Sequence, residues 1–324
     1  MQFKNIVVKI MSKKLGIIMD PIQSINVKKD TSLLILLAAK KSGFTLYLIE
    51  QNDLYLDCDE PRALTAELNV FDDEKEWFEL KTKRDISIND LDVILMRKDP
   101  PFNKEYIYST YILEAAKRKG VLIVNDPQSL RDCNEKIFAT EFKQFTPPLI
   151  VTKNIKLLKA FLAQNEEVVY KPLDGMGGES IFKVNYKDEN INVILETLTK
   201  FGTRTIMAQK YIADISNGDK RILIIGGRVI PLCLARIPPK GEFRGNLAAG
   251  GSGIVKQLSE RDLLIANSVA KICVKRGLLF VGLDIIGNFL TEINVTSPTC
   301  AREIDKELDF SIGDLFMECI SKRL

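Results

Sequence analysis

Short apolar runs alternate with amphipathic stretches along the first part of the chain. The apolar runs predict buried strands at residues 15–19, 44–49, 92–97 and 121–124. The amphipathic stretches predict helices, each followed by a glycine stop, at residues 33–41 and 106–119. Strands that alternate with helices predict an α/β fold with an open, parallel, Rossmann-like sheet. Ligands of such sheets lie beyond the carboxyl ends of the strands, where Arg97 leaves an apolar run directly before a Pro-Pro stop.

The pattern changes twice further along, which indicates three units. We place their boundaries at residues 15–130, 131–212 and 213–324, after an N-terminal extension at residues 1–14. The extension is inferred because residues 11–14 look like a second start; the alternative is a genuine first strand at residues 1–10. Residues 129–136 predict a capped helix start. The last unit predicts, in order, paired strands, a helix and a final hairpin at residues 221–225, 228–235, 260–276 and 280–295.

A lysine precedes a glycine-rich segment in the middle unit. Lys171 ends the apolar run 168–171, a glycine loop follows at residues 175–178 (Gly-Met-Gly-Gly), and residues 180–184 alternate again. In a P-loop the lysine follows the glycines and a helix comes next, so this order excludes a P-loop. Strand, glycine loop and strand describe a flexible cover whose free N–H groups suit phosphates, with the lysine approaching from the sheet. For this segment alone, an ordinary glycine turn is the alternative.

Three oxygen-bearing side chains interrupt the apolar strands of the final hairpin. Glu292 and Asn294 are two residues apart and share one face of their strand, and Asp284 lies in the preceding strand. Buried oxygens of this kind must be paired or bind a metal, and a set without His or Cys suits Mg²⁺ or Mn²⁺. A plain two-residue turn would put Asp284 opposite Thr291, so a metal site requires a longer turn or a bulge that puts it opposite Glu292. A surface hairpin with polar alternation is the alternative.

A long segment of small residues, the arginine loop at residues 236–253, carries Arg236 and Arg244. Loops of this length often cover active sites, and two arginines suit a phosphorylated or carboxylate substrate. A disordered surface loop is the alternative.

Composition limits the chemistry that is open to the chain. Its 324 residues include no His, which excludes Ser-His-Asp and Cys-His catalysis and His-ligated zinc. The six cysteines are far apart, so we expect reduced thiols in a cytoplasmic protein. With a net charge of +3, no long run of like charges and no membrane-length apolar run, we expect neither nucleic acid nor a membrane as partner.

These elements together fit phosphoryl transfer, because cations and a metal spread the charge of the moving group without a histidine. The lysine and glycine loop, the arginine loop and the final hairpin resemble the ATP-grasp superfamily. A closer resemblance, to bacterial glutathione synthetases, lies in residues 19–22, 94–102, 171–178, 244–251 and 291–299. It runs from about residue 15 to the C-terminus. It implies a pre-ATP-grasp substrate domain, then a two-part ATP-grasp domain with a central lid subdomain and a metal-binding C-terminal subdomain.

The family resemblance implies an activity and an assembly. ATP would phosphorylate a carboxylate of γ-L-glutamyl-L-cysteine, and the amine of glycine would attack the resulting acyl phosphate. The products would be glutathione, ADP and phosphate. The family also implies Mg²⁺ or Mn²⁺, small-molecule substrates and a homotetramer.

The resemblance further implies roles for individual residues. ATP would contact Lys136, Lys171, Gly175, Met176, Gly177, Gly178, Gln209, Lys210, Tyr211, Ile212, Asp219 and Lys220. The metal would be held by Asp284, Glu292 and Asn294. Transition-state charge would be stabilised by Arg221, Arg236 and Arg244. Substrate carboxylates and polar groups would be bound by Arg97, Asn294, Ser297 and Arg302.

Two other functions stay open at this stage. Another ATP-grasp carboxylate–amine ligase, such as a D-alanine–D-alanine ligase or a ribosomal-protein glutamate ligase, would share the same loops, although residues 97–102 argue against both. A synapsin-type nucleotide-binding module would share them without catalysis. The metal-ligand set and the two arginines of the arginine loop disfavour that module, because a protein that only binds nucleotide needs no transition-state cations.

Overall fold

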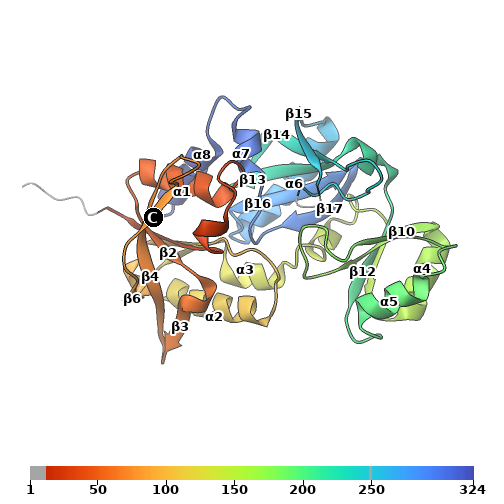
Figure 1. Ribbon diagram of the computed structural model, residues 1–324, viewed down its shortest axis with the longest axis horizontal. Helices are drawn as coiled ribbons and strands as arrows, with labels where there is room; N and C mark the ends of the chain where they lie inside the picture. Colours follow the sequence, from red (N-terminus) through yellow and green to blue (C-terminus); the bar gives the residue numbers. More distant parts are fainter. Residues whose placement is uncertain (1–11, 248–249) are drawn as a thin grey trace, which may run out of the picture.

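The computed structural model describes residues 12–247 and 250–324. Figure 1 shows an N-terminal unit at one end, a C-terminal sheet beside it, and a separate small unit at the other end. Within the described residues the first strand, β1, begins at Lys14. The predicted extension at residues 1–14 therefore lies almost entirely outside the described residues.

The N-terminal unit contains the predicted parallel sheet. Its strand order is β3-β4-β2-β1-β7-β8. Parallel pairing confirms the prediction for β1 (Lys14–Ile18), β2 (Thr45–Ile49), β7 (Val93–Met96) and β8 (Leu122–Val124). The sheet is flanked by the predicted helices α1 (Thr31–Lys41) and α2 (Lys104–Arg118).

Antiparallel strands at the edge of this sheet were not predicted. They are β3 (Leu54–Asp57), β4 (Glu60–Val70), β5 (Phe78–Leu80) and β6 (Arg84–Ser87). Most residues of β3 and β6 are exposed, so these strands lack the regular apolar alternation by which a half-buried strand is recognised.

Side-chain caps fix where the helices begin. Asp30 accepts a hydrogen bond from the Leu33 N–H at the start of α1, and Asn103 does the same for Tyr106 in α2. The predicted helix start at residues 129–136 is wrong. Because Asp126 is the N-cap and Pro127 takes the first position, α3 (Pro127–Asp132) begins earlier and has ended before Lys136.

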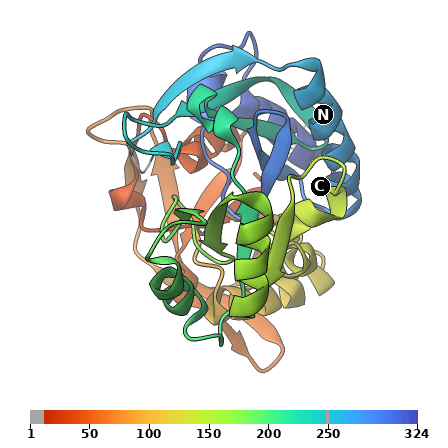
Figure 2. The same ribbon diagram turned by 90° about the vertical axis from the view of Figure 1, so that its right-hand side faces the viewer.

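The small unit at the far end, here called the lid subdomain, has a core of its own. It is a four-stranded antiparallel sheet covered by two helices, and Figure 2 views it from the front in green. Its core is formed by Leu158, Leu162, Val168, Tyr170, Leu195 and Leu198, together with neighbouring aliphatic residues. Its elements are β9 (Leu149–Thr152), α4 (Ile155–Asn165), β10 (Glu167–Pro172), β11 (Phe182–Asn185), α5 (Ile191–Thr199) and β12 (Ile206–Lys210).

The C-terminal unit is an antiparallel sheet of order β15-β14-β13-β16-β17. Its strands are β13 (Asp219–Ile225), β14 (Arg228–Ile237), β15 (Ser252–Gln257), β16 (Phe280–Ile286) and β17 (Phe289–Asn294). Its helices are α6 (Glu260–Lys275), α7 (Ala301–Asp305) and α8 (Ile312–Ser321). Short 3-10 turns connect elements throughout the chain at η1 (Ile22–Ser24), η2 (Gln51–Asp53), η3 (Ile88–Asp90), η4 (Phe138–Phe142) and η5 (Ala213–Asn217). Among the described residues, no helix has the length and hydrophobicity needed to cross a membrane.

The N-terminal and C-terminal units share their cores. Strands β1 and β7 contribute to the same apolar clusters as β13 and β16, and α8 packs on α1, where Gly313 lies against Ala38. Asn125 reinforces this junction. Its side-chain amide donates to the carbonyls of Phe280 and Val295, and its side-chain oxygen accepts from the N–H groups of Leu279 and Phe280. The two units therefore form one body, to which the lid subdomain is attached.

We expect Asn125→Ala to lower the free energy of unfolding by on the order of 3 kcal/mol or more, because it leaves several buried backbone groups unpaired. Urea unfolding measures this. The matched change Asn267→Ala removes an exposed amide that donates to the Leu263 carbonyl within α6. It should stay within about 0.5 kcal/mol of the unaltered chain. Equal effects of the two changes would contradict the role of Asn125.

Candidate active site

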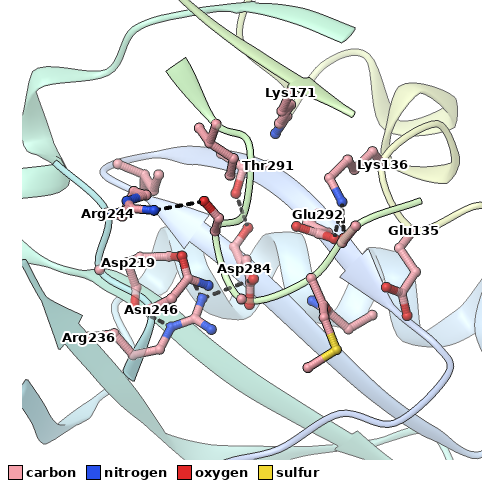
Figure 3. A pocket seen from close by; sticks show the side chains of 18 of the residues that line it. Glu135, Lys136, Lys171, Asp219, Arg236, Arg244, Asn246, Asp284, Thr291 and Glu292 are labelled. Atoms are coloured by element: carbon pink, nitrogen blue, oxygen red, sulfur yellow. Dashed lines mark hydrogen bonds and ion pairs between the residues drawn. The ribbon is translucent and has the colours of Figure 1, made fainter. Parts of the chain in front are cut away.

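A cavity of about 290 Å³ lies between the lid subdomain and the C-terminal sheet. Figure 3 shows Lys171 on one side of it, from the lid subdomain, and Asp284 and Glu292 on the other side, from the body. The glycine loop, the arginine loop and residues 296–300 complete its lining. Segments that are more than 150 residues apart in sequence thus meet at one place.

A buried charge cluster forms the floor of the cavity. Asp284, only 4% exposed, accepts a hydrogen bond from Arg221 Nε at 2.7 Å and forms an ion pair with Arg236 at 2.9 Å. Arg236 also bonds Asp219 at 2.5 Å. Cross-strand pairing brings these groups together, because Arg221 lies opposite Asp284 and Asp219 lies opposite Arg236.

The cluster shifts the two carboxyl pKa values in opposite directions. Burial alone would raise the pKa of Asp284, but Arg221 and Arg236 outweigh it and hold that pKa far below its ordinary value. Burial dominates for Asp219 and raises its pKa to about 6 despite the nearby Arg236. The Oδ1 atom of Asp219 accepts no hydrogen bond from the described residues, so it is free for a ligand.

Gly282 makes room for the side chain of Arg221. A Cβ atom at this position would lie 3.1 Å from Cδ of Arg221 and 3.0 Å from Pro298. Any side chain there would push Arg221 away from Asp284. The glycine between two apolar residues of β16 therefore has a packing reason that its sequence does not display.

The final hairpin has the register that a metal site requires. A two-residue turn is combined with a bulge at Thr291, which places Asp284 opposite Glu292. The hydroxyl of Thr291 donates to the carbonyl of Asp284 at 3.0 Å across the bulge. The prediction that Asp284 lies opposite Glu292 is confirmed, and a bulge is the device that achieves it.

The donor set at this hairpin fits a hard divalent cation. Among the described residues, no three His, Cys, Asp or Glu side chains cluster closely enough to hold a metal by themselves. The candidate set therefore consists of two carboxylates, Asp284 and Glu292, and the Asn294 amide, whose Nδ2 bonds Gly282 and leaves its oxygen available. Both carboxylates already have cationic partners, since Glu292 Oε1 accepts from Lys136 Nζ at 3.0 Å.

Two loops cover the cavity and contact each other. Lys136 Nζ donates to the carbonyl of Gly175 at 3.1 Å, and an Arg244 N–H donates to the carbonyl of Gly178 at 3.1 Å. Arg244 is held in turn by Glu242 at 2.6 Å. Gly178 has φ +84°, and a Cβ atom there would lie 2.9 Å from the Asn246 side chain. The glycine loop and the arginine loop thus close over the same space.

Lys171 is almost fully buried under this cover. Its ammonium group donates to the Gln209 side chain at 3.1 Å. Burial lowers its pKa to about 8, although Glu292 opposes the shift. An anionic ligand would supply the counter-charge that the unliganded protein provides only weakly.

The structure brings most of the predicted site residues together. The cavity is lined by Lys136, Lys171, Gly175, Met176, Gly177, Gly178, Gln209, Lys210, Tyr211, Ile212, Asp219, Arg221, Arg236, Arg244, Asp284, Glu292, Asn294 and Ser297.

The described residues that line the cavity do not include Lys220, Arg97 or Arg302. Lys220 points to the opposite face of β13, where it pairs with Asp262, because strand neighbours alternate between faces. Arg97 lies behind the site, donates to the Pro298 carbonyl at 2.9 Å and stacks on Phe280. Arg302 reaches back to the carbonyl of Val27 and to Asp72 in the N-terminal unit.

Several lining residues were missed. Glu135, Asn246 and Thr291 supply polar groups, and apolar lining comes from Val169 and Ile181 of the lid subdomain and from Ile215 and Ile286 of the body. A single apolar residue in a strand gives no signal that its side chain faces a ligand. The position of Glu135 beside Lys136 was the only available hint.

Comparison with known proteins agrees with the geometry. A family model described as the N-terminal domain of prokaryotic glutathione synthetase matches residues 13–131, and the model of the ATP-grasp domain of that enzyme matches residues 135–309. A protein of Pseudomonas aeruginosa named glutathione synthetase is 57% identical over 314 residues, covering 97% of this chain and 99% of that protein. One of Escherichia coli K12 with the same name is 55% identical, covering 96% and 98%.

Solved structures share the fold at low sequence identity. The D-cycloserine synthetase DcsG superposes with a TM-score of 0.67 at 12% identity, covering 96% of this chain and 99% of that one. D-alanyl-alanine synthetase A of Vibrio cholerae gives 0.61 at 12% identity, covering 96% and 98%. The ATP-grasp ligase PsnB gives 0.63 at 12% identity, covering 97% and 100%.

We expect Lys171→Met to stabilise the unliganded protein near neutral pH. Lys171 has a pKa of about 8 in the folded protein, below its ordinary 10.5, so the unfolded chain binds the proton more tightly. The difference corresponds to about 3 kcal/mol below both values. As the pH rises from about 8 towards 10.5, the folded protein loses this penalty, and the advantage of the variant should shrink.

Urea unfolding of both proteins over this pH range measures the effect. Lys210→Met, which removes an exposed lysine of β12, serves as the control. An advantage of Lys171→Met that is independent of pH would contradict the lowered pKa.

Proposed function

The chain belongs to the prokaryotic glutathione synthetase family, and from this membership and the geometry of the cavity we propose that it joins γ-L-glutamyl-L-cysteine to glycine, converting ATP to ADP and phosphate. One observation carries the proposal from the side of the structure. One cavity is lined by two lysines, two buried arginines, the glycine loop, the arginine loop and the oxygen donors of the final hairpin. That combination suits the transfer of a phosphoryl group to a carboxylate.

The nucleotide would lie between the lid subdomain and the body. Lys171 and Lys136 would contact its phosphates from opposite sides, and the glycine loop would cover them. The segment from Gln209 to Ile212 ends β12 and offers backbone groups for the edge of a base. The apolar residues of the cavity would pack against the faces of the base. Gln209 Nε2 and Asp219 Oδ1, both buried and without a partner among the described residues, would donate to and accept from the nucleotide.

A divalent cation, Mg²⁺ or Mn²⁺, would be held by Asp284, Glu292 and Asn294, and when bound it would neutralise phosphate charge. The cationic partners of the carboxylates bear on its binding. Lys136 would exchange its contact with Glu292 for a phosphate oxygen. Asp284 would keep one arginine while an oxygen turns to the metal. Lys220, which faces Asp262 on the other side of β13, is not part of this proposed site.

A carboxylate is a poor electrophile, and phosphorylation gives it a leaving group. In the proposed reaction, the substrate carboxylate attacks the γ-phosphorus of ATP and ADP leaves. The amine of glycine then attacks the acyl phosphate carbon, phosphate leaves with the C–O bond electrons, and the proton that the nitrogen loses is taken up by the departing phosphate. Arg221, Arg236 and Arg244 would stabilise the charge that develops on the phosphoryl group and on the tetrahedral oxygen. The two loops would exclude water, which would otherwise hydrolyse the acyl phosphate.

The peptide substrate would lie at residues 294–300, near the carboxyl ends of the N-terminal strands. Asn294 and Ser297 line the cavity there, and Asp99 and Pro100 approach from the N-terminal unit. Arg97 would act from behind, through the Pro298 carbonyl. For Arg302, whose guanidinium is engaged by Val27 and Asp72, direct contact with substrate would require a rearrangement.

We also propose a cytoplasmic homotetramer. The six cysteines are all free, which suits a reducing compartment. The tetramer follows from the family resemblance alone, and light scattering of the purified chain would test it.

Phosphate release tests the proposed function directly. We expect turnover that requires ATP, γ-L-glutamyl-L-cysteine and glycine together, with glutathione formed in equal amount to phosphate. Another ATP-grasp carboxylate–amine ligase would release phosphate only with other amino acids, and that result would refute the proposal. A module that only binds nucleotide would release none.

We expect Glu292→Gln to lower kcat by at least about a hundredfold while the fold persists, because it removes one metal-ligand charge. The free Mg²⁺ concentration needed for half-maximal activity should rise as well. Initial rates across a Mg²⁺ titration measure both effects, with the exposed α5 variant Glu196→Gln as control. Unchanged turnover at limiting Mg²⁺ would remove Glu292 from the metal site.

A further inference from the structure

Glu135 has a role that the proposed mechanism does not use. It lines the cavity next to Lys136, but as a carboxylate it is not suited to binding phosphate. Its Oε1 atom accepts three hydrogen bonds, from the Val295 N–H at 2.8 Å, the Thr296 N–H at 3.0 Å and the Thr296 hydroxyl at 2.8 Å. Its backbone carbonyl accepts a fourth, from the Ile293 N–H at 2.9 Å.

The segment that Glu135 holds carries the residues on which the reaction depends. Val295 and Thr296 lie between Asn294, a proposed metal ligand, and Ser297, a proposed substrate contact. They follow the last residue of β17, so the sheet ladder no longer fixes their N–H groups. Glu135 Oε1, which accepts from both of these successive N–H groups, takes over that task, because backbone donors beyond the ladder need another acceptor.

The residues on either side of Glu135 bind the other parts of the site. Asn134 Nδ2 donates to the Leu173 carbonyl at 3.0 Å, just before the glycine loop. Lys136 donates to the Gly175 carbonyl and to Glu292. Three consecutive side chains thus connect the lid subdomain, the final hairpin and the turn after β17.

We propose that Glu135 is a positioning residue, which fixes the backbone of Val295 and Thr296 so that Asn294 and Ser297 meet the peptide substrate in register with the phosphates bound by Lys136. This inference rests on the proposed function for its catalytic consequence. Its structural part, the fixed backbone at residues 295–296, does not depend on which substrate is used.

Two conservative variants separate the effect of side-chain length at residue 135 from the effect of its charge. Glu135→Asp keeps the carboxylate but is one methylene shorter, so Oδ cannot reach both N–H groups without moving the backbone. Glu135→Gln keeps the length and an acceptor oxygen but loses the charge. A positioning role predicts that Asp is the damaging change and that Gln is mild. A role through charge, such as binding the ammonium group of glycine or a metal, predicts the reverse.

The first measurement is amide hydrogen exchange of Val295 and Thr296 in the unliganded chain. We expect at least about tenfold faster exchange in Glu135→Asp and a change within about threefold in Glu135→Gln. The matched control is Glu141→Asp. It shortens an exposed glutamate of η4 that lies outside the cavity and pairs with Arg276. It should leave both amides unchanged.

The second measurement is steady-state kinetics together with the equilibrium affinity for ADP. We expect Glu135→Asp to raise KM for γ-L-glutamyl-L-cysteine and lower kcat, together about tenfold or more in kcat/KM, with ADP affinity within about threefold. Glu135→Gln should recover most of this loss.

The outcomes are distinct. Equal or greater damage from Glu135→Gln, or unchanged exchange in Glu135→Asp, overturns the positioning role. If the unaltered chain makes no glutathione, the proposed function fails, and hydrogen exchange still decides whether Glu135 fixes this backbone.

Discussion

The burial of Asp284 between two arginines is the constraint on which the site depends. A carboxylate in this position is stable only if its partners are fixed, because an unpaired buried charge is far more costly than a paired one. Arg221 and Arg236 are fixed because they lie on neighbouring strands, β13 and β14, whose register places them beside Asp284 and Asp219. The pairing of an ordinary antiparallel sheet therefore sets the positions of the charges that we propose to act on the phosphoryl group.

The division of the molecule into a body and a lid subdomain explains where the cavity lies. The body is held together by apolar cores that continue from the N-terminal sheet into the C-terminal sheet. The lid subdomain has its own core and meets the body at the cavity through polar contacts such as Asn134 with Leu173 and Lys136 with Gly175. Polar contacts of this kind exchange readily for contacts with a ligand, whereas a shared apolar core does not. The proposed site therefore lies where polar contacts, rather than a shared apolar core, join the two parts.

Side chains that bind backbone groups organise the rest. Asn125 joins the end of β8 to Phe280 of β16 and to Val295, just after β17, and Glu135 holds the turn that follows β17. Neither residue contacts the phosphoryl group in the proposed reaction. Each satisfies buried or half-buried backbone groups that no sheet ladder reaches, and so fixes the backbone next to the proposed site residues.

The sequence by itself determined which strands and helices alternate along the chain to form the parallel sheet. It also determined the position of Lys171 before the glycine loop and the oxygen-donor character of the final hairpin. These are local properties, which spacing and alternation record. The alternation of strand faces also required a longer turn or a bulge to place Asp284 opposite Glu292, and the structure has a bulge at Thr291. Only the tertiary structure decided that Lys220 faces away, that Arg97 and Arg302 lie behind the cavity and that Glu135 holds residues 295–296. Those facts depend on which strand faces and distant segments meet, and pairing between residues far apart in the chain leaves no periodic trace in the sequence.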